Sequence, residues 1–407
     1  MLLCETPSLS RRALLAAGGA LFSWAYLPRF ARAESARDPR LVVMVLRGAL
    51  DGLSAVAPIG DPDYPALHGA LALRLDGEHA ALPLDSFFAL NPAMPNFARL
   101  YQARQALTVH ACATNYRERS HFDGQDVLES GMPGPGRVES GWLNRALGLL
   151  PKGERVAPRG LAVGSTPPLV LRGGAPVLGW APSGLPAVSD DLTARLLDLY
   201  NHRDPGLAAA LKAGLDADRL AMKQGMEGLK PGGDVAAAMR KAAEGAARLV
   251  ASDDGPRVAA MAFDGWDTHA NEGGATGRLA QLLRGLDGAI AAFESELGPL
   301  WKDTAIVAIT EFGRTVHING TVGTDHGTGT VAFLAGGAVA GGRVVADWPG
   351  LKTADLYEGR DLKPTTDLRA VLKGLLADQF GLSARMLGET VFPDTAAVAP
   401  MKGLIAA

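Results

Sequence analysis

The sequence predicts an α/β fold with a mostly parallel central sheet, and three observations lead to this prediction. Short apolar segments of strand length recur along the 407 residues, and segments with helical composition alternate with them. The apolar segments are continuous, which is typical of strands covered on both faces. The chain is 47% hydrophobic and contains 50 glycines, so it can form a large core with many loops.

Six apolar segments are expected to form the strands. They are LVVMVL at 41–46, ALTVHACA at 106–113, GLAVG at 160–164, RVAAMAF at 257–263, TAIVAIT at 304–310 and TVAFLAGG at 330–337. Because a parallel sheet binds its ligand at the carboxyl ends of its strands, the residues that follow these segments are the first candidates for a site.

Four helices are expected between and after these strands, at 207–228, 234–252, 275–298 and 366–380. Thr365, Thr366 and Asp367 are candidate caps of the last helix. Stretches rich in glycine and proline are expected to be surface loops, at 131–137, 173–186 and 229–233. Because the chain has no internal repeat, residues 34–407 are expected to form a single domain, with a candidate helical cap at 190–252.

The N-terminus has the features of an export signal. Arg11 and Arg12 precede the moderately apolar stretch ALLAAGGALFSWAYLP, and a small-x-small cleavage site ends at Ala33. The apolar stretch is shorter than the roughly 20 residues that a membrane span requires. We therefore predict a twin-arginine signal peptide at 1–33, the twin-arginine export machinery as a partner, no permanent membrane anchor, and a periplasmic or extracellular protein after cleavage near Ala33.

Charge and cysteine content exclude further classes of protein. Removing the four arginines and one glutamate of the signal from 40 basic and 43 acidic residues leaves 36 against 42, a formal charge of −6. Nucleic acid is therefore not an expected partner. Of the two cysteines, Cys4 lies in the signal and Cys112 remains alone, so the mature chain is expected to have no intrachain disulfide.

Polar residues gather where two of the expected strands end. Asp51 follows the first strand in a glycine-flanked loop, a pattern that suits either a metal-binding carboxylate or a turn aspartate. Asp267 and His269 follow the strand at 257–263. A carboxylate and an imidazole this close together are ligands typical of Zn, Mn and similar metals, so we interpret Asp267 and His269 as functional residues.

Glu311, Arg314 and Ser120 extend this set. Glu311 directly follows the strand at 304–310, so it must be paired, metal-bound or exposed at the mouth of the site. Arg314 offers either a local ion pair to Glu311 or a clamp for phosphate or sulfate. Ser120 and Asp123 form a pattern similar to a capping box, but a hydroxyl at a helix N-terminus also suits a nucleophile that accepts a phosphoryl group.

The motif GTDHG at 323–327 suits a metal site, a catalytic pair or a polar turn. It precedes the strand at 330–337, so the loop at 311–329 has to fold back to bring Asp325 and His326 to the same rim. The glycines on both sides permit a close approach of the backbone. The sequence has no GxSxG, GxxxxGK[ST], HExxH, CxPxR or SxPxR pattern, so common serine hydrolases, P-loop proteins, zincins and formylglycine sulfatases lack their signatures here.

Several motifs together resemble a known family. LRGALDGLSAV, SHFDGQDVLESG, FDGWDTHANE, TEFGRT, GTDHG and PTTDLRAVL, with the twin-arginine signal, resemble the uncharacterised bacterial family called domain of unknown function fifteen-oh-one, over residues 40–382. That family is similar to the alkaline phosphatase and sulfatase superfamily, whose members hold two metal ions at the strand ends of an α/β sandwich. The resemblance implies a three-layer, alkaline-phosphatase-like sandwich.

The resemblance also implies roles for individual residues. Asp51 matches the acidic ligand after the first strand, and Ser120, or less closely Thr114, lies in the region of the nucleophile. Asp267 and His269 match paired ligands after a later strand, although their spacing is shorter than usual.

Further along the chain, Glu311 takes the position of the strand-end acid, and His326 matches a separate histidine before the next strand. Phe312 stands where the superfamily has a histidine, which leaves one metal site a ligand short, and Asp325 is the candidate substitute or supporting partner.

The expected function is therefore that of a metal-dependent hydrolase of phosphate or sulfate esters, acting on a small anionic ester or a polymer. Ser120 is the expected nucleophile, Arg314 or Arg47 the anion clamp, and one or two divalent ions (Zn, Mn, Ca or Mg) the cofactor. The expected metal ligands are Asp51, Asp267, His269, Glu311, Asp325 and His326.

Two alternatives remain open at this point. The first is a non-catalytic exported assembly or binding protein that retains the fold. The second is a polymer-binding module that uses Trp142, Trp266 and Trp348 at the rim.

Overall fold

The computed structural model describes residues 37–136, 138–151, 160–182, 190–223 and 234–406. The chain divides into two units, residues 1–38 and 39–407, and the second contains nearly all of the described residues. The predicted signal peptide at 1–33 and the loop at 229–233 lie outside the described residues. Within the described ranges, no helix is long and apolar enough to cross a membrane.

A nine-stranded sheet forms the centre of the second unit, in the order β11-β5-β10-β9-β1-β8-β6-β7, with β12 paired to β5. Its strands are β1 (Arg40–Arg47), β5 (Ala106–Ala113), β6 (Gly160–Val163), β7 (Val177–Trp180), β8 (Val258–Asp264), β9 (Thr304–Ile309), β10 (Thr330–Ala335), β11 (Arg343–Val345) and β12 (Thr366–Asp367). Within this sheet, the described pairings are parallel except those of β10 with β5 and β9, which are antiparallel. The prediction of a mostly parallel sheet is confirmed.

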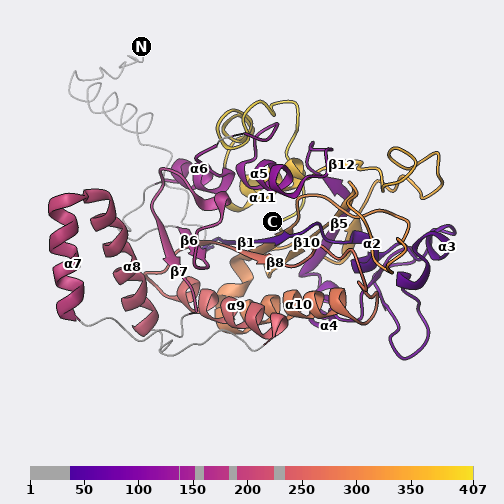
Figure 1. Cartoon of the computed structure of the whole chain (residues 1–407), viewed down its shortest axis with the longest axis horizontal. Helices are drawn as coiled ribbons and strands as arrows, with labels where there is room; N and C mark the ends of the chain where they lie inside the picture. Colours follow the sequence, from indigo (N-terminus) through magenta and orange to yellow (C-terminus); the bar gives the residue numbers. More distant parts are fainter. Residues whose placement is uncertain (1–36, 137, 152–159, 183–189, 224–233, 407) are drawn as a thin grey trace, which may run out of the picture. The chain divides into compact units, whose positions relative to one another are not determined.

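Helices cover both faces of this sheet (Figure 1). One face carries α4 (Pro95–Gln102), α9 (Val235–Ala251) and α10 (Arg278–Leu297), and the other carries α5 (His121–Ser130), α6 (Trp142–Leu149) and α11 (Leu368–Phe380). Asp367 caps α11 as expected, because its side chain accepts a hydrogen bond from the Arg369 backbone NH at 2.9 Å. The three-layer α/β arrangement is therefore confirmed.

Strand β1 explains why the apolar segments are continuous. Val42, Met44 and Leu46 pack into one core, and Leu41, Val43 and Val45 pack into the other. Side chains alternate between the two faces of a strand, so a strand between two helical layers needs apolar residues at every position. Full burial of each such aliphatic side chain contributes about 1.5–3 kcal/mol to stability.

The remaining elements lie around the central layers. Short helices α2 (Gly52–Ala55) and α3 (Tyr64–His68) follow β1, and β2 (Val56–Ala57), β4 (Ala89–Leu90) and β3 (Leu82–Pro83) form a small antiparallel sheet. A hairpin of α7 (Asp190–Arg203) and α8 (Pro205–Lys223) projects at one end (Figure 1). The expected cap at 190–252 thus comprises this hairpin and α9, and α9 itself packs on the sheet.

Helical turns η1 (Gly69–Leu71), η2 (Leu169–Leu171), η3 (Gly298–Asp303) and η4 (Leu387–Val391), with α12 (Ala384–Met386), complete the described elements. Strands β8, β1 and β9 are adjacent and parallel, so their carboxyl ends lie at the same edge of the sheet. The loops that leave this edge carry most of the candidate residues.

Candidate metal centre

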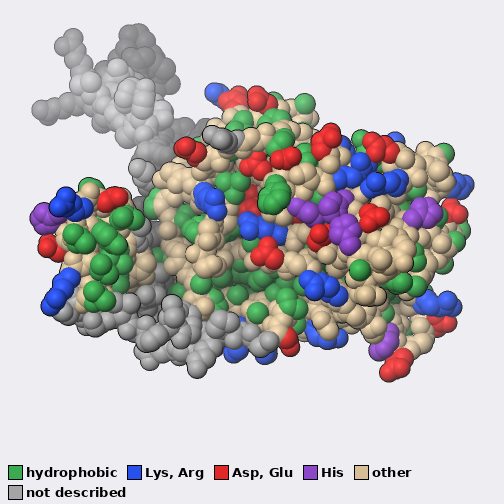
Figure 2. Space-filling view, in the orientation of Figure 1, with side chains coloured by type: hydrophobic (Ala, Val, Ile, Leu, Met, Phe, Trp, Pro, Cys, Tyr) green, Lys and Arg blue, Asp and Glu red, His purple; other side chains and the backbone are tan. Residues whose placement is uncertain are grey.

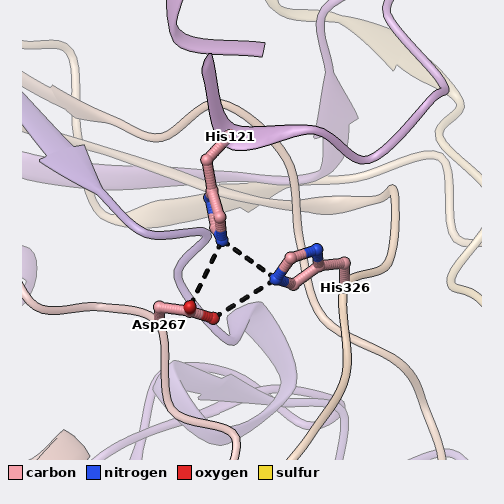
Figure 3. Close-up of side chains that lie close together, drawn as sticks. All are labelled: His121, Asp267 and His326. Carbon is pink, nitrogen blue, oxygen red and sulfur yellow. Dashed lines mark hydrogen bonds and ion pairs between the residues drawn. The ribbon is translucent and has the colours of Figure 1, made fainter. Parts of the chain in front are cut away.

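Three histidines and one aspartate meet at this edge, and we call His121, Asp267, His269 and His326 the rim cluster. The Nε2 atom of His326 lies 2.9 Å from Nε2 of His121 and 3.0 Å from Nε2 of His269. Oδ1 of Asp267 lies 3.0 Å from Nε2 of His269 and 3.4 Å from Nε2 of His326, and Oδ2 lies 3.4 Å from Nε2 of His121. Figure 3 shows three of these side chains pointing toward one another.

The spacing of these atoms fits a metal site. Ligand atoms placed tetrahedrally at about 2.0–2.1 Å from a zinc ion are about 3.3 Å apart, close to the distances within the rim cluster. His121, Asp267 and His326 offer ligand atoms that all lie within 4.8 Å of one another. The side chains of His121, His269 and His326 are 22%, 44% and 27% exposed, and Figure 2 shows histidines gathered on this face among acidic and basic side chains.

The other ring nitrogen of each histidine is occupied by an acceptor. Nδ1 of His121 lies 2.9 Å from Glu311 Oε1, and Nδ1 of His269 lies 3.1 Å from Asp325 Oδ1. Nδ1 of His326 lies 2.9 Å from the Arg119 carbonyl oxygen. Each contact requires a proton on Nδ1, so in neutral imidazoles all three Nε2 atoms carry a lone pair, and Nε2 of His326 lies within 3.0 Å of the other two. Histidines that bind metals are held in this way.

Glu311 is the buried carboxylate that contacts Nδ1 of His121. Its carboxylate also accepts hydrogen bonds from the Gly48 backbone NH at 2.8 Å, Gln125 Nε2 at 3.1 Å and the Thr310 hydroxyl at 3.0 Å. Burial alone would raise the pKa of Glu311, but the hydrogen bonds, with His121 first among them, outweigh it and lower the pKa. The same contact raises the pKa of His121.

Arg314 holds Asp267 from behind. Its Nη1 donates to Asp267 Oδ1 at 2.7 Å, its Nε donates to the Thr324 hydroxyl at 3.0 Å, and its Nη2 donates to the Thr324 carbonyl. Burial would raise the pKa of Asp267, but Arg314 outweighs burial and lowers it. Asp267 is therefore an ionised carboxylate in a fixed orientation.

The loop between β9 and β10 folds back as its sequence predicts. Arg314 and His326 form an isolated antiparallel bridge, which returns the GTDHG motif to the rim. A Cβ atom on Gly323 would lie 2.3 Å from the His269 carbonyl oxygen, and one on Gly327 would lie 2.3 Å from the Arg314 carbonyl oxygen. Only glycine permits these approaches, so the two glycines of the motif bring His326 and Asp325 to the cluster.

Asp267, His269 and His326 are the predicted ligands that the structure brings together. Glu311 and Asp325 each stand one residue behind the cluster, on the Nδ1 atoms of His121 and His269. Both residues were predicted as direct ligands. In the structure each carboxylate instead accepts a hydrogen bond from the Nδ1–H group of a rim histidine.

Asp51 lies apart from the rim cluster. Its carboxylate caps α2 by accepting from the Leu53 backbone NH at 3.0 Å, and it pairs with His68 Nε2 at 3.1 Å in the interior. Asp51, expected as a metal ligand with the rim residues, therefore caps α2 and pairs with His68 instead.

The predicted catalytic residues Ser120 and Arg314 differ in how the structure uses their side chains. Ser120 is the N-cap residue of α5, but within the described chain its side chain makes no capping hydrogen bond, so the expected capping box does not form. Arg314 is 1% exposed and bound to Asp267 and Thr324, which favours a positioning role over an anion clamp. Thr114 is buried.

One ligand candidate was not predicted from the sequence. His121 follows Ser120 directly, and its place beside a helix N-terminus in SHFDG was the available signal. Two of the three tryptophans proposed for a rim, Trp142 and Trp266, are at most 1% exposed, so they cannot present ring faces to a polymer.

A sequence profile of the family described as "Protein of unknown function (DUF1501)" matches residues 38–391. The chain belongs to this family. The family that the motifs predicted over residues 40–382 is thereby confirmed for this DUF1501 protein. A search of curated proteins finds no match.

Solved structures show distant similarity to this DUF1501 protein. Ps i-CgsB in complex with k-i-k-neocarrahexaose is 12% identical, with a TM-score of 0.44, over 89% of this chain and 77% of that one. The phosphonate monoester hydrolase of Agrobacterium radiobacter is 13% identical, with a TM-score of 0.31, over 84% of this chain and 74% of that one.

Proposed function

We propose that this DUF1501 protein is a metal-dependent hydrolase of phosphate or sulfate esters. The observation that carries the proposal is the convergence of three imidazole Nε2 atoms on the Asp267 carboxylate, with every Nδ1 atom held by an acceptor. When all three imidazoles are neutral and no cation is bound, their Nε2 lone pairs and the carboxylate oxygens of Asp267 lie only 2.9–3.4 Å apart. A bound cation removes this repulsion.

The charges and donor types favour a transition metal. The carboxylates of Asp267, Glu311 and Asp325 and the guanidinium of Arg314 leave an excess of two negative charges, which suits a divalent ion. Imidazole nitrogens with one carboxylate suit zinc, manganese or a similar metal, whereas calcium and magnesium prefer oxygen ligands. We propose one such ion, bound by His121, Asp267, His269 and His326.

The ion, when bound, would polarise the ester oxygens and activate a hydroxyl for attack. Ser120 supplies that hydroxyl in this proposal, because it adjoins His121 at the positive end of α5 and its side chain is not used as a cap anywhere in the described chain. As Ser120 Oγ bonds to phosphorus or sulfur, the bond to the leaving-group oxygen breaks and that oxygen takes the proton that Ser120 gives up, directly or through water. Water then hydrolyses the seryl ester, which releases phosphate or sulfate and regenerates Ser120.

Arg47 is the proposed anion clamp. Its side chain is 27% exposed, and Nε and Nη2 donate to Glu129 Oε1 at 3.0 and 2.5 Å, which fixes the guanidinium plane. The Arg47 carbonyl accepts from the Trp266 backbone NH at 3.2 Å, next to Asp267. An arginine held on one side and open on the other is suited to a phosphate or sulfate oxygen.

The remaining parts of the proposal concern where the protein acts. The paired arginines and the cleavage site at Ala33 support twin-arginine export to the periplasm, with a small anionic ester or polymer as substrate. The second candidate function is a non-catalytic exported assembly or binding protein that keeps one metal. The observation that favours it is the single convergent cluster among the described side chains, with Phe312 packed against His121 where a second site would need a ligand.

The test uses purified mature protein. Metal content is measured first, followed by hydrolysis of an aryl phosphate, an aryl phosphodiester and an aryl sulfate by wild type, Asp267→Ala and His326→Ala. The exposed His317, in the same loop as His326, provides the matched control His317→Ala. About one metal per chain with turnover that both site variants lose supports the hydrolase; metal without turnover on any ester favours the second candidate; absence of metal contradicts both.

A further inference from the structure

A second group of ionisable side chains lies entirely inside the protein. Asp51, Ser54, His68 and Glu272, which we call the buried cluster, are 0–1% exposed. His68 Nε2 lies 3.1 Å from Asp51 and 2.7 Å from the Ser54 hydroxyl, and its Nδ1 lies 3.0 Å from the Val316 carbonyl oxygen. Neither the fold nor the proposed hydrolysis uses Glu272, the fourth member.

The hydrogen bonds of Glu272 leave one of its oxygens without a donor. Oε2 accepts from the Thr324 hydroxyl at 2.7 Å. That hydroxyl itself accepts from Arg314 Nε at 3.0 Å, so its single proton is committed to Glu272. Oε1 is buried and meets no donor within the described chain, and the Asp51 carboxylate lies close enough to Glu272 for the two side chains to interact directly.

Two carboxylate oxygens can bond to each other only if one carries a proton. Asp51 already accepts from the Leu53 backbone NH and pairs with His68, so its charge is compensated. Glu272 has no cation in direct contact among the described residues, because Thr324 stands between it and Arg314. Burial, the largest influence, raises the pKa of Glu272 well above its ordinary range, and the charge of Asp51 raises it further.

We propose that Glu272 is an uncharged carboxylic acid that donates to Asp51, and that Glu272 and Thr324 are positioning residues for the metal ligand Asp267. The proposed contacts run from Asp51 through Glu272, Thr324 and Arg314 to Asp267. The positioning part rests on the proposed metal centre, whereas the protonation of Glu272 does not.

The uncharged form has a physical purpose. Arg314 is buried, and its guanidinium is directed at Asp267 while Thr324 receives Nε and Nη2. An ionised Glu272 beyond Thr324 would compete with Asp267 for the charge of Arg314 in a medium of low dielectric. A neutral acid keeps Thr324 in place through a hydrogen bond and leaves the charge of Arg314 to Asp267.

Conservative and disruptive variants separate this role from simple packing. Glu272→Gln mimics the neutral acid, because its amide can donate to Asp51 and accept from Thr324. Glu272→Ala removes both contacts, Thr324→Ser keeps the hydroxyl, and Thr324→Val removes it. Each full-length mature variant is measured for Zn²⁺ affinity by competition with a chelator, and for the visible spectrum of the Co²⁺-loaded site.

We expect Glu272→Gln and Thr324→Ser to bind Zn²⁺ within about threefold of wild type with an unchanged Co²⁺ spectrum. Glu272→Ala and Thr324→Val should weaken Zn²⁺ binding by about 10- to 100-fold, the usual effect of losing a partner behind a ligand. If Glu272→Ala does not fold, Thr324→Val, which is close in volume, decides the result. Wild-type affinity and spectrum in a folded Glu272→Ala or Thr324→Val would overturn the positioning role.

The proton itself is tested without metal. The infrared difference between wild type and Glu272→Gln at pH 7 should contain the carbonyl band of a protonated carboxylic acid. Its absence, or a loss of Zn²⁺ affinity in Glu272→Gln as large as in Glu272→Ala, would overturn the neutral acid. A wild-type protein that binds no metal would instead overturn the proposed function, and the infrared band would still decide the state of Glu272.

Discussion

The rim cluster and the buried cluster contain the same kinds of side chain in opposite arrangements. In the rim cluster, each imidazole gives Nδ1 to an acceptor and turns Nε2 toward a partly exposed centre. In the buried cluster, both nitrogens of His68 contact oxygen atoms of Val316, Asp51 and Ser54, and the imidazole is 0% exposed. Imidazole lone pairs are available in the first cluster and occupied in the second.

Whether a histidine can bind a metal therefore depends on whether one of its two ring nitrogens is left without a hydrogen-bond partner from the protein interior. Burial of the Asp51–His68 pair with hydrogen bonds on every side favours a structural role, since ions removed from water must be fully compensated. The side chains of the rim cluster are partly exposed, so an ion in solution can reach them. Variants in the rim cluster should therefore change mainly Zn²⁺ binding, and variants in the buried cluster should change mainly stability.

Removing a rim ligand should have the largest effect. His326→Ala is expected to weaken Zn²⁺ binding by more than about 100-fold, because a direct ligand contributes more than the partners behind it. Chelator competition measures this change, and His317→Ala is the control. A decrease of less than tenfold in His326→Ala would show that His326 is not a ligand.

Removing His68 should lower stability instead of metal binding. His68→Ala leaves the Asp51 carboxylate buried without its cation, which costs about 3–5 kcal/mol of unfolding free energy. Urea denaturation measures the loss, and the exposed His79 gives a control, His79→Ala, expected within about 0.5 kcal/mol of wild type. A loss of bound Zn²⁺ in folded His68→Ala with little change in stability would reverse the roles of the two clusters.

The sequence predicted the fold better than the roles of individual residues. Strand β5 occurs at the predicted residues 106–113, because a buried strand needs an uninterrupted apolar segment that the sequence displays directly. The reversed direction of β10 depends on its pairing with β5 and β9, which no local pattern contains.

At the site, the sequence predicted which residues approach the rim but not their order from the centre of the rim cluster outward. Glu311 follows a strand as a ligand would, yet His121 comes from a distant helix and takes the position between Glu311 and the centre. Ser120 and Asp123 form a pattern typical of a helix cap, and no local pattern distinguishes His121 as a ligand from an ordinary first-turn residue. Asp51 was predicted as a ligand because it follows a strand and no partner for its carboxylate is evident in the sequence. Its partner, His68, lies in the short helix α3, which was not predicted.

The carboxylates behind the rim histidines should differ from each other. Glu311→Gln is expected to weaken Zn²⁺ binding by about 10- to 100-fold, because a buried amide cannot replace the charge that fixes His121. Asp325→Asn should cost only about two- to fivefold, since Asp325 is 56% exposed and water screens its charge. Chelator competition on both variants checks the order, and a larger loss in Asp325→Asn would contradict it.

The buried cluster should also impose a pH dependence on stability. Burial opposes the charge on both partners, but their mutual attraction outweighs it, so the pKa of Asp51 falls to about 2 and that of His68 rises. The Asp51 contribution, about 2 kcal/mol, is present above its ordinary pKa of 3.8 and is lost as the pH falls toward 2. The His68 contribution is present below 6.5 and is lost as the pH rises through its raised pKa.

Comparing wild type with His68→Gln isolates the contribution of the Asp51–His68 charge interaction to stability. The difference in unfolding free energy, from urea denaturation with chelator present, should be greatest between about pH 4 and 6.5 and should decrease on both sides. A difference that stays constant from pH 3 to 9 would show that Asp51 and His68 do not stabilise each other's charges.

The most direct test of the account is to locate the metal in crystals of the mature protein by anomalous scattering at the zinc edge, after loading with one equivalent of Zn²⁺. We expect one strong peak among Nε2 of His121, His269 and His326 and the Asp267 carboxylate, with no peak between Asp51 and Glu272. A peak at the buried cluster, or none at the rim cluster, would contradict it.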